Sequence, residues 1–513
     1  MGAVDVLTVE QRLETVQGET LRKGSTTMAG HRKPFEPRVR LSYLEEGAKR
    51  RLIDGSLRVL EEVGGLVQHD GALTLLHQAG CACRADGLVR IPRLVVERAI
   101  STVPASIILH DRTGEPALQL GGYNTYFGTG SDLMWQYDPE TGERRVSTLD
   151  DVARVSRLCE ALPGMDFVMS GAYPTELPPK GAYLATFTSM MSNCTKPLVI
   201  VAENEVDLGA VVDVAEELRG GGDELRVRPY LLVYVEPVSP LTHPRDSMAK
   251  LLLCAERGVP VAYVPGHLAG ATGPISNAGH IVQGMAECLL GLVVHQLAAP
   301  GAPFMFGVNQ ATLDMVSGQC SYTSVECFMN FVAAVEMGKW LGLPNWGIAG
   351  CTDSQAIDMQ MGLEAGELTL LAMLTGSNLN HDVGFLGFGL TGSLEEIVIT
   401  DEFISLNRKL LGGFGVGDED LAVDVIASVG PQGHYLGNAH TRAQLRSGMG
   451  QWRPTLLNRD THERWLERGA PDLGETARRK VVEILAGPPV PAVASGVLAT
   501  AEQRLADLRG AAT

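Results

Sequence analysis

The stretch Gly347-Ile348-Ala349-Gly350-Cys351-Thr352-Asp353-Ser354 joins a short apolar run to a long helical pattern. The apolar run is Leu343–Trp346, and the helical pattern begins near Ile357. A buried strand followed by a helix is the repeating unit of a barrel in which the loops after the strands build the active site. About thirty residues later, Leu379–Phe385 repeats the arrangement with polar residues at the end of an apolar segment. Two successive turns of this kind predict one shared pocket.

Apolar runs too short for helices recur beyond residue 120, and amphipathic helical patterns follow them. The eight expected strands are Thr125–Gly128, Asp166–Ser170, Pro197–Ala202, Tyr230–Glu236, Val259–Val264, Pro303–Val308, Pro344–Ala349 and Leu379–Val383. The expected helices are Leu149–Leu162, Tyr183–Ser192, Asp207–Leu218, Asp246–Ala255, Ala278–Leu297, Ser324–Leu341, Ile357–Leu374 and Ser393–Leu411. Continuously apolar strands that alternate with helices indicate a parallel sheet covered on both faces. Eight such units favour an α/β fold of the (β/α)8 TIM barrel type.

An open, Rossmann-like sheet is the alternative fold. No expected strand is followed by GxGxxG or by GxxxxGK[ST], the loops that cradle nucleotide phosphates. The barrel is therefore the favoured prediction.

The segments around the barrel divide the chain into four regions. We expect a flexible N-terminal arm at residues 1–36, an N-terminal α+β cap at 37–120, the barrel at 121–412 and a C-terminal helical extension at 413–513. The cap has helical patterns at 53–63, 72–79 and 94–102 and short strands at 88–91 and 107–109. The extension has helical patterns at 420–427, 440–445 and 473–485, which we expect to wrap the outside of the barrel, and a tail with a last helical pattern at 497–508.

Composition and charge restrict the class of protein. The 513 residues hold 42 Lys and Arg against 60 Asp and Glu, a net charge of −18 that argues against nucleic acid or an anionic membrane as partner. The nine cysteines are scattered without a CxxC pair, as in proteins with reduced thiols. No secretory signal pattern and no run of ~20 apolar residues is present, so we expect a cytoplasmic protein without a membrane span.

The residues at the carboxyl ends of the strands are the candidates for the site. The substrate-binding candidates are Phe127, Asp132, Tyr173, Glu236, His267, Asn309, Cys351, Asp353, His381 and Asp382. Aromatic faces and carboxylates together suit a cation that has no hydrogen-bond donors, because neither group needs a directed bond to attract it. The set therefore predicts a small quaternary amine as ligand, with no catalytic group beyond those that position the substrate.

Several candidates have a structural interpretation that the sequence leaves open. Phe127 and Tyr173 could be packing residues, and His381 could be a core histidine bonded to a backbone carbonyl. Cys351 has no basic neighbour in sequence, as is usual for a structural cysteine. The spacing of the histidines and cysteines lacks the short first interval of zinc sites, so we expect no metal.

Several stretches together resemble the trimethylamine methyltransferase family over roughly residues 40–486. They are Phe127–Asp132, Asp166–Ser170, Ala278–Gly307, Cys351–Ser354 and the run from His381 to Glu395. The resemblance implies a (β/α)8 barrel that moves a methyl group from an amine to the cobalt of a separate corrinoid protein, as in methanogenesis-type one-carbon metabolism. We also expect a homo-oligomer.

The chain resembles the branch of that family without pyrrolysine. The founding enzymes carry pyrrolysine in the loop after the seventh strand, and this chain has ordinary residues throughout that loop near Cys351. Members of the branch that resembles this chain act on quaternary amines such as glycine betaine. A quaternary nitrogen already bears the charge that makes the neutral amine a leaving group, so positioning and electrostatics suffice.

The resemblance also implies where the cofactor is bound and what the site residues do. Asp460-Thr461-His462 lacks the DxHxxG continuation of corrinoid proteins, so the Co(I) cobalamin is expected on a partner and not tightly bound to this chain. Phe127 and Tyr173 would contact the cation, Glu236 would balance its charge, and His381 would donate a hydrogen bond to a substrate carboxylate. Two alternatives stay open: a barrel that binds quaternary amines without methyl transfer, and a zinc-dependent methyltransferase on the same fold.

Overall fold

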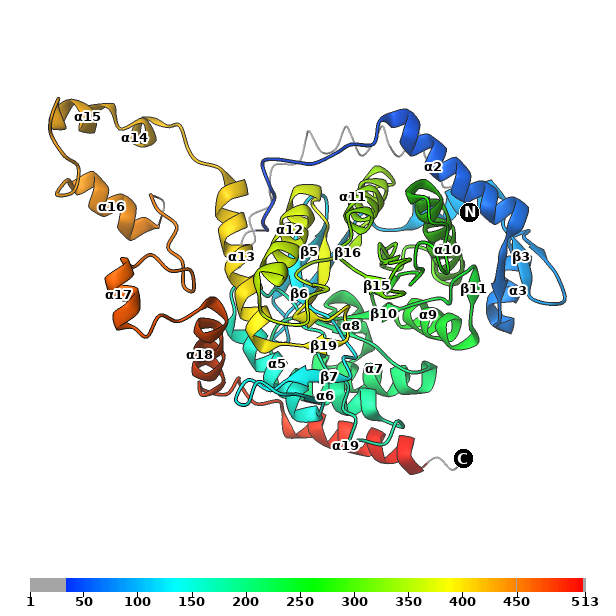
Figure 1. The fold of residues 1–513 in the computed structure, drawn as a ribbon. Coiled ribbons are helices and arrows are strands. Elements are labelled where there is room, and N and C mark those ends of the chain that lie inside the picture. The colour runs from blue at the N-terminus through cyan, green and yellow to red at the C-terminus, as the bar shows by residue number, and fades with distance from the viewer. Residues whose placement is uncertain (1–33, 449, 511–513) are drawn as a thin grey trace.

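The computed structural model describes residues 34–448 and 450–510, which form a mixed α/β fold around eight parallel segments (Figure 1). The segments are β6 (Tyr126–Thr129), residues 167–168, β9 (Leu198–Ile200), β10 (Leu231–Val235), β12 (Val261–Tyr263), β13 (Phe304–Phe306), β16 (Trp346–Ile348) and β17 (Leu379–Val383). Each lies within, or differs by one residue from, a strand that the sequence predicts. The predicted N-terminal arm lies outside the described residues except for residues 34–36.

Parallel pairings connect these segments in a closed cycle. Strand β17 pairs with β16 and β6, β10 pairs with β9 and β12, and β12 pairs with β13. Isolated parallel bridges supply the remaining links, Gly128 to Phe167, Val168 to Leu198 and Phe306 to Asn345. An open sheet would lack one of these links. We call the eight segments the parallel ring.

One helix follows each segment of the ring. These helices are α5 (Leu149–Ala161), α6 (Ala182–Asn193), α7 (Glu205–Arg219), α9 (Arg245–Arg257), α10 (Asn277–Ala298), α11 (Val325–Trp340), α12 (Met359–Thr375) and α13 (Leu394–Gly412). A short α8 (Gly222–Val227) follows α7. Local signals fix the ends of α7, because Asn204 Oδ1 accepts hydrogen bonds from the backbone N–H groups of Val206 and Asp207 at 3.0 and 3.1 Å. The helix ends at Arg219, and the capping residue after it is Gly220, whose φ of 90° favours glycine.

Successive side chains along the ring face two different cores. Tyr126, Phe167, Leu232 and Leu379 belong to one buried cluster, while the neighbouring Phe127 belongs to another that includes the covering helices. Side chains of a strand point alternately to its two faces. The first cluster therefore fills the ring and the second lies between the ring and its helices.

The N-terminal region contributes helices outside the ring and a hairpin at its end. The elements are α2 (Glu46–Arg58), the π-helical turn η1 (Val59–Val63), β1 (Gly65–Val67), α3 (Asp70–Gln78), β2 (Ala82–Cys83), β3 (Leu88–Arg90), α4 (Arg93–Thr102), β4 (Ser106–His110) and β5 (Pro116–Gly121). Strands β4 and β5 form an antiparallel hairpin. Its residues Ile107, Leu109, Leu118 and Leu120 belong to the cluster inside the ring. This hairpin closes the end of the ring at which the strands begin.

Short strands decorate the loops after the ring segments. They are β7 (Trp135–Tyr137), β8 (Arg144–Val146), β11 (Thr242–His243), β14 (Thr312–Leu313), β15 (Cys320–Ser321), β18 (Phe385–Leu386) and β19 (Thr391–Gly392). Strand β19 pairs with β7 and β18, so the loops after the first and the last ring segments are joined. These loops surround the other end of the ring.

Among the described residues, α10 is the one helix long and apolar enough to cross a membrane. Within its apolar window, 78% of the residues are buried inside the protein. Its polar His280, Glu287 and His295 are buried as well. A helix that is apolar all round and buried is typical of the core of a large fold.

The C-terminal region contains α14 (Asp418–Leu421), α15 (Val423–Val429), α16 (Ala439–Ser447), α17 (His462–Glu467), α18 (Leu473–Leu485) and α19 (Ser495–Gly510). Helices α18 and α19 pack on the outside of the ring helices, where Arg478 pairs with Glu395 and Arg504 with Asp213. Helices α14 to α16 lie away from the body (Figure 1), and none of their described residues is buried. The expectation that all of these helices wrap the exterior is therefore wrong for α14 to α16.

Candidate functional site

A cavity of about 330 Å³ lies where the strands of the ring end. It is lined by Ser131, Asp132, Met169, Val201, Tyr234, Glu236, Lys250, Val264, Asn309, Gln310, Tyr322, Trp346, Ile348, His381, Asp382, Phe385 and Gly389. This volume is within the usual range for small-ligand sites, about 300–1,000 Å³. The walls combine aromatic rings with ionisable groups.

Three rings from three strands form the aromatic wall. The ring centroids of Tyr234 and Trp346 are 5.0 Å apart, those of Trp346 and His381 4.8 Å, and those of Tyr234 and His381 5.8 Å. Tyr322 and Phe385 add two further aromatic side chains from loops. Aromatic faces attract cations through the quadrupole of the ring. The arrangement therefore provides a surface for a positively charged group.

Two carboxyl groups that line the cavity are in positions where burial disfavours the ionised form. Burial raises the pKa of Asp132 to about 6, and the hydroxyl of Tyr183 lies 3.4 Å from its Oδ2 atom. Burial likewise raises the pKa of Glu236, although the hydroxyl of Tyr234 donates a hydrogen bond to it. A bound cation would offset this cost, because it stabilises the ionised forms.

His381 and Asp382 form a pair at the end of β17. The Nδ1 atom of His381 lies 2.6 Å from Oδ1 of Asp382. An ionised Asp382 accepts a hydrogen bond from a protonated Nδ1, which leaves Nε2 of His381 for another partner. Asp382 has a φ of 76°, and a Cβ atom at Gly130 would collide with its carboxylate. The glycine at position 130 therefore makes room for this pair.

Lys250 adds an amino group to the lining residues. Its Nζ atom donates a hydrogen bond to the carbonyl oxygen of Ala202 at 2.7 Å. Burial lowers the pKa of Lys250, and the charges of Asp246, Glu236 and Asp207 oppose that shift. The cavity therefore contains one amino group and three carboxyl groups.

The structure brings together half of the residues that the sequence proposes for substrate binding. Asp132, Glu236, Asn309, His381 and Asp382 line the cavity. The side chain of Asn309 accepts hydrogen bonds from the backbone N–H groups of Gln310 and Ala311, at 2.7 and 3.1 Å. It therefore also shapes the loop after β13.

Phe127 and His267 lie outside the lining of this cavity. Phe127 is fully buried in the cluster that contacts the covering helices, because its neighbour Tyr126 takes the inward position of the strand. His267 is buried, and its ring stacks on His280 with centroids 3.8 Å apart. Burial lowers the pKa of His267, which favours a neutral imidazole.

Tyr173, Cys351 and Asp353 also lie outside the lining. The ring of Tyr173 contacts Tyr183 edge to face at 5.9 Å. Burial raises the pKa of Cys351 well above the ordinary value, which disfavours a thiolate. Asp353 accepts hydrogen bonds from the hydroxyl of Ser321 at 2.5 Å and from the backbone N–H of Tyr322 at 3.0 Å, so it holds a lining loop.

Sequence reasoning missed the aromatic residues and the lysine that line the cavity. Tyr234 precedes the predicted Glu236 by two positions, and side chains two apart in a strand share a face. That signal was available from the sequence. Trp346 and His381 are on the adjacent strands β16 and β17, in which Ile348 pairs with His381. The contact between Trp346 and His381 could be predicted only if the register of these two strands were known. Lys250 comes from α9, where no strand pattern indicates that it lines the cavity.

Within the described residues, no group of three or more His, Cys, Asp or Glu side chains could hold a metal ion. The cavity is also small for a corrin ring with its nucleotide tail, since its volume is at the lower end for small-ligand sites. The residues present fit a small organic ligand.

Comparison with known proteins identifies related sequences over most of the chain. Residues 14–505 match the family of trimethylamine methyltransferases (MTTB). The trimethylamine methyltransferase MttB of Desulfitobacterium hafniense (strain DSM 10664 / DCB-2) is 31% identical over 436 residues, which cover 84% of this chain and 86% of that protein. The glycine betaine methyltransferase of Desulfitobacterium hafniense (strain Y51) is 30% identical over 430 residues, with coverage of 83% and 88%. The crystal structure of the monomethylamine methyltransferase of Methanosarcina barkeri aligns with a TM-score of 0.47 at 11% identity, covering 94% of this chain and 93% of that one.

Proposed function

The chain belongs to the trimethylamine methyltransferase family, and from that premise we propose that it transfers a methyl group from a small quaternary amine to the Co(I) cobalamin of a partner corrinoid protein. The proposed substrate is glycine betaine or a closely related quaternary amine. Glycine betaine is the substrate in the name of one similar protein, which is 30% identical to this chain. One observation carries the proposal: a cavity that combines the rings of Tyr234 and Trp346 with the carboxyl groups of Asp132, Glu236 and Asp382.

This cavity suits a fixed positive charge better than a protonated amine. A quaternary ammonium group has no N–H to donate, so it gains from ring faces and from charge rather than from directed hydrogen bonds. Burial disfavours the ionised forms of Asp132 and Glu236. A bound cation that stays charged at every pH stabilises these ionised carboxylates. The proposed substrate therefore supplies the positive charge that stabilises these buried carboxylates.

The residues of this chain would orient the cation and exclude water from it. The aromatic side chains of Tyr234 and Trp346 would contact two methyl groups of the cation. The third methyl group would then point toward the open end of the parallel ring, where the strands end. The partner would supply a Co(I) nucleophile, which takes the methyl group while the electron pair of the broken N–C bond stays on nitrogen. The carboxylates lose attraction for the nitrogen as it becomes neutral, which favours release of the tertiary amine.

The other end of glycine betaine is a carboxylate, and two groups of the cavity can receive it. While Nδ1 of His381 bonds to Asp382, its Nε2 atom is available to the ligand, and Lys250 adds a basic group. A hydrogen bond from Nε2–H of His381 would fix the carboxylate and thereby orient the ammonium group. His381 and Lys250 are therefore the proposed specificity residues, with Asn309 beside them.

Further proposals concern the fold and location. The closed cycle of parallel pairings supports a (β/α)8 TIM barrel at residues 121–412, with a cap at 37–120 and a helical extension at 413–513. The burial of α10 fits a protein of the cytoplasm. The small cavity supports a cobalamin that is held by a partner covering the open end of the ring.

The test is nuclear magnetic resonance detection of demethylated products. The protein is incubated with Co(I) cobalamin and, separately, with glycine betaine, tetramethylammonium and trimethylamine. We expect dimethylglycine from glycine betaine and no product from trimethylamine, which lacks the fixed charge.

Matched variants separate the competing functions. Trp346→Leu should lower the rate, whereas Phe127→Leu should leave it unchanged because Phe127 faces the covering helices. Binding of glycine betaine without any product would favour a binding protein, and stoichiometric zinc together with zinc-dependent turnover would favour the zinc-dependent alternative. Demethylation of trimethylamine in preference to glycine betaine would contradict the proposed substrate.

A further inference from the structure

The segment from residue 413 to 448, which we call the C-terminal arm, lacks a surface to pack on. Its helices have four, seven and nine residues, and none of its residues is buried. Isolated helices shorter than about 12–15 residues are marginal in water. The arm extends from the end of α13 away from the rest of the molecule (Figure 1). These helices therefore need a further contact to be stable.

The arm exposes apolar side chains that are usually covered. Phe414 is 82% exposed and Leu436 86% exposed. Leu421, Val423 and Ile426, which lie along α14 and α15, are exposed as well. Large apolar side chains that are gathered on one exposed segment mark an interaction surface.

The same part of the arm carries carboxylates without basic partners. Asp418, Glu419 and Asp424 form no ion pair with any described residue, and Asp420 accepts a hydrogen bond from the backbone N–H of Gly417 at 3.1 Å. The partner of this segment should therefore be apolar and basic.

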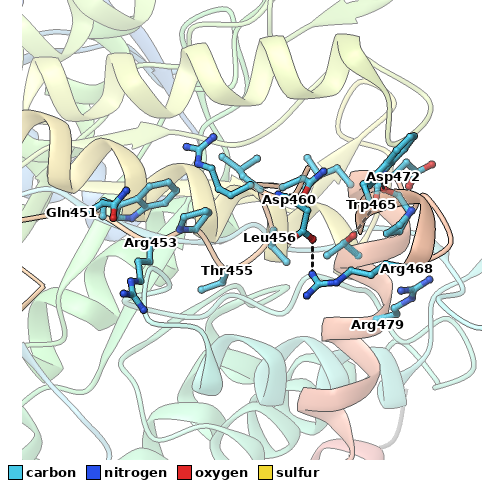
Figure 2. Close-up of a pocket in the computed structure, with 17 residues that line it drawn as sticks. Gln451, Arg453, Thr455, Leu456, Asp460, Trp465, Arg468, Asp472 and Arg479 are labelled. Atoms are coloured by element: carbon cyan, nitrogen blue, oxygen red, sulfur yellow. Dashed lines mark hydrogen bonds and ion pairs between the residues drawn. The ribbon is translucent and has the colours of Figure 1, made fainter. Parts of the chain in front are cut away.

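A groove with that character lies in the segment after the arm. Its volume is about 790 Å³, and it is lined by residues of the range 451–479 (Figure 2). Trp452, Pro454, Trp465 and Leu473 supply apolar surface. Gln451 and Arg453 lie toward one end in Figure 2, and Trp465 and Asp472 toward the other.

Some of the arginines that line the groove have no ion-pair partner among the described residues. Arg468 pairs with Asp460 at 2.7 Å, and Asp472 caps α18 by accepting a hydrogen bond from the N–H of Glu475. Arg453, Arg459 and Arg479 form no ion pair with any described residue. Three arginines without partners thus match three carboxylates of the arm.

We propose that residues 414–429 of one copy of the chain occupy the groove at 451–479 of a second copy. Each chain carries one segment and one groove, and the helices α14 and α15 of the segment lie apart from α17 and α18, whose residues line the groove (Figure 1). Reciprocal exchange around a two-fold axis would fill both grooves and cover both arms. Copies of a chain with net charge −18 repel one another overall. A local contact of acidic residues with basic residues opposes this repulsion and sets the register of the two chains.

The test uses two charge-reversed variants of the full chain. The arm variant is Asp418→Lys, Glu419→Lys, Asp424→Lys, and the groove variant is Arg453→Glu, Arg459→Glu, Arg479→Glu. Size-exclusion chromatography with light scattering measures the mass of each variant, of the unaltered protein and of an equimolar mixture of the two. We expect the unaltered protein to form dimers or multiples of dimers and each variant alone to lose that association.

The mixture is decisive, because the reversed arm of one variant matches the reversed groove of the other. The expected result is a mixed dimer that contains both variants in equal amounts. A monomeric unaltered protein would mean that the arm folds back onto its own groove and would overturn the proposal. Variants that assemble like the unaltered protein, or a mixture that stays monomeric while both variants keep their circular dichroism spectra, would overturn it as well.

Discussion

The two ends of the parallel ring are built from the same strands and hold opposite kinds of side chain. At the closed end, Leu109 and Leu120 of the β4–β5 hairpin share an apolar cluster with Leu379 of β17. At the open end, the same β17 presents His381 and Asp382 to the cavity. One strand thus serves both the packing of the ring and the proposed chemistry.

The difference separates what stabilises the molecule from what the ligand needs. The closed end removes apolar surface from water, the main favourable term in folding. The open end buries Asp132 and Glu236, whose pKa values are raised because burial disfavours their charge. Ionised carboxylates there cost stability that a bound cation can restore. Changes at the closed end should therefore act on folding, and changes at the open end on binding.

The largest expected effect is at the closed end. Leu109→Ala should lower the free energy of unfolding by about 2–5 kcal/mol, the range for removing a buried leucine side chain. The residue is fully buried, so the lost volume leaves a cavity. Chemical denaturation monitored by circular dichroism measures the change.

Ile108→Ala is the matched control, because Ile108 is the neighbouring residue of β4 and is exposed. Its cost should be within about 0.5 kcal/mol, as for most surface substitutions. The affinity of both variants for tetramethylammonium should match that of the unaltered protein. Equal costs for the two substitutions would remove the distinction between the two faces of the hairpin.

Most of the fold could be predicted from the sequence because it follows periodicity. Each of the eight predicted barrel helices corresponds to a helix whose ends differ by at most two residues. The arm was predicted less well. Residues 420–427 have a helical pattern, but a pattern does not tell whether a surface exists on which the helix can pack, and α14 and α15 lie away from the body.

The site was harder to predict, because its residues meet only through the register of the strands. His381 and Asp382 follow an apolar run and were visible as candidates, whereas Phe127 was chosen by its position at a strand end. Its side chain faces the helices because Tyr126 takes the inward position. Parity along a strand cannot be fixed from an apolar run without knowing which residue faces inward.

The second expected effect concerns the substrate carboxylate at the open end. His381→Ala should weaken glycine betaine binding by about 1.5–3 kcal/mol, the range for a hydrogen bond to a charged group. Tetramethylammonium has a similar cationic head and no carboxylate, so it should lose much less. Calorimetry on both ligands decides the point. Equal losses would mean that His381 only supports the rings of Tyr234 and Trp346, and no loss for either would mean that it is structural.

The third expected effect concerns the aromatic wall. Trp346→Leu should weaken tetramethylammonium binding by up to about 2 kcal/mol, since a ring contact with a desolvated cation has that magnitude. Phe127→Leu is the control and should leave binding unchanged while lowering stability, because its ring packs against the covering helices. If Phe127→Leu weakened binding as much as Trp346→Leu, the assignment of these two aromatic residues to opposite faces would be wrong.

The smallest expected effect is the pH dependence that Asp132 gives to the open end. Its pKa is raised from 3.8 to about 6 by burial, so between about pH 4 and 6 the folded protein holds a proton that the unfolded chain has released. Stability contributed by Asp132 is therefore fully present below that window and is lost as the pH rises through it. In thermal unfolding experiments, the stability of the Asp132→Asn variant should therefore decrease less between about pH 4 and 6 than that of the unaltered protein.

Binding of a cation should follow the opposite sign. Tetramethylammonium carries its charge at every pH and favours the ionised form of Asp132, so its affinity should fall as the pH is lowered through about 6. The loss should reach about 1.4 kcal/mol for each unit by which the bound cation lowers the pKa of Asp132. Calorimetry between pH 5 and 7.5 on the unaltered protein and on Asp132→Asn measures it, and the variant should bind more weakly at the upper pH with a flatter profile. An affinity that rises toward low pH would mean that the protonated carboxyl favours the ligand. Asp132 would then have to be removed from the groups that balance the cation, and Glu236 and Asp382 would remain to do so.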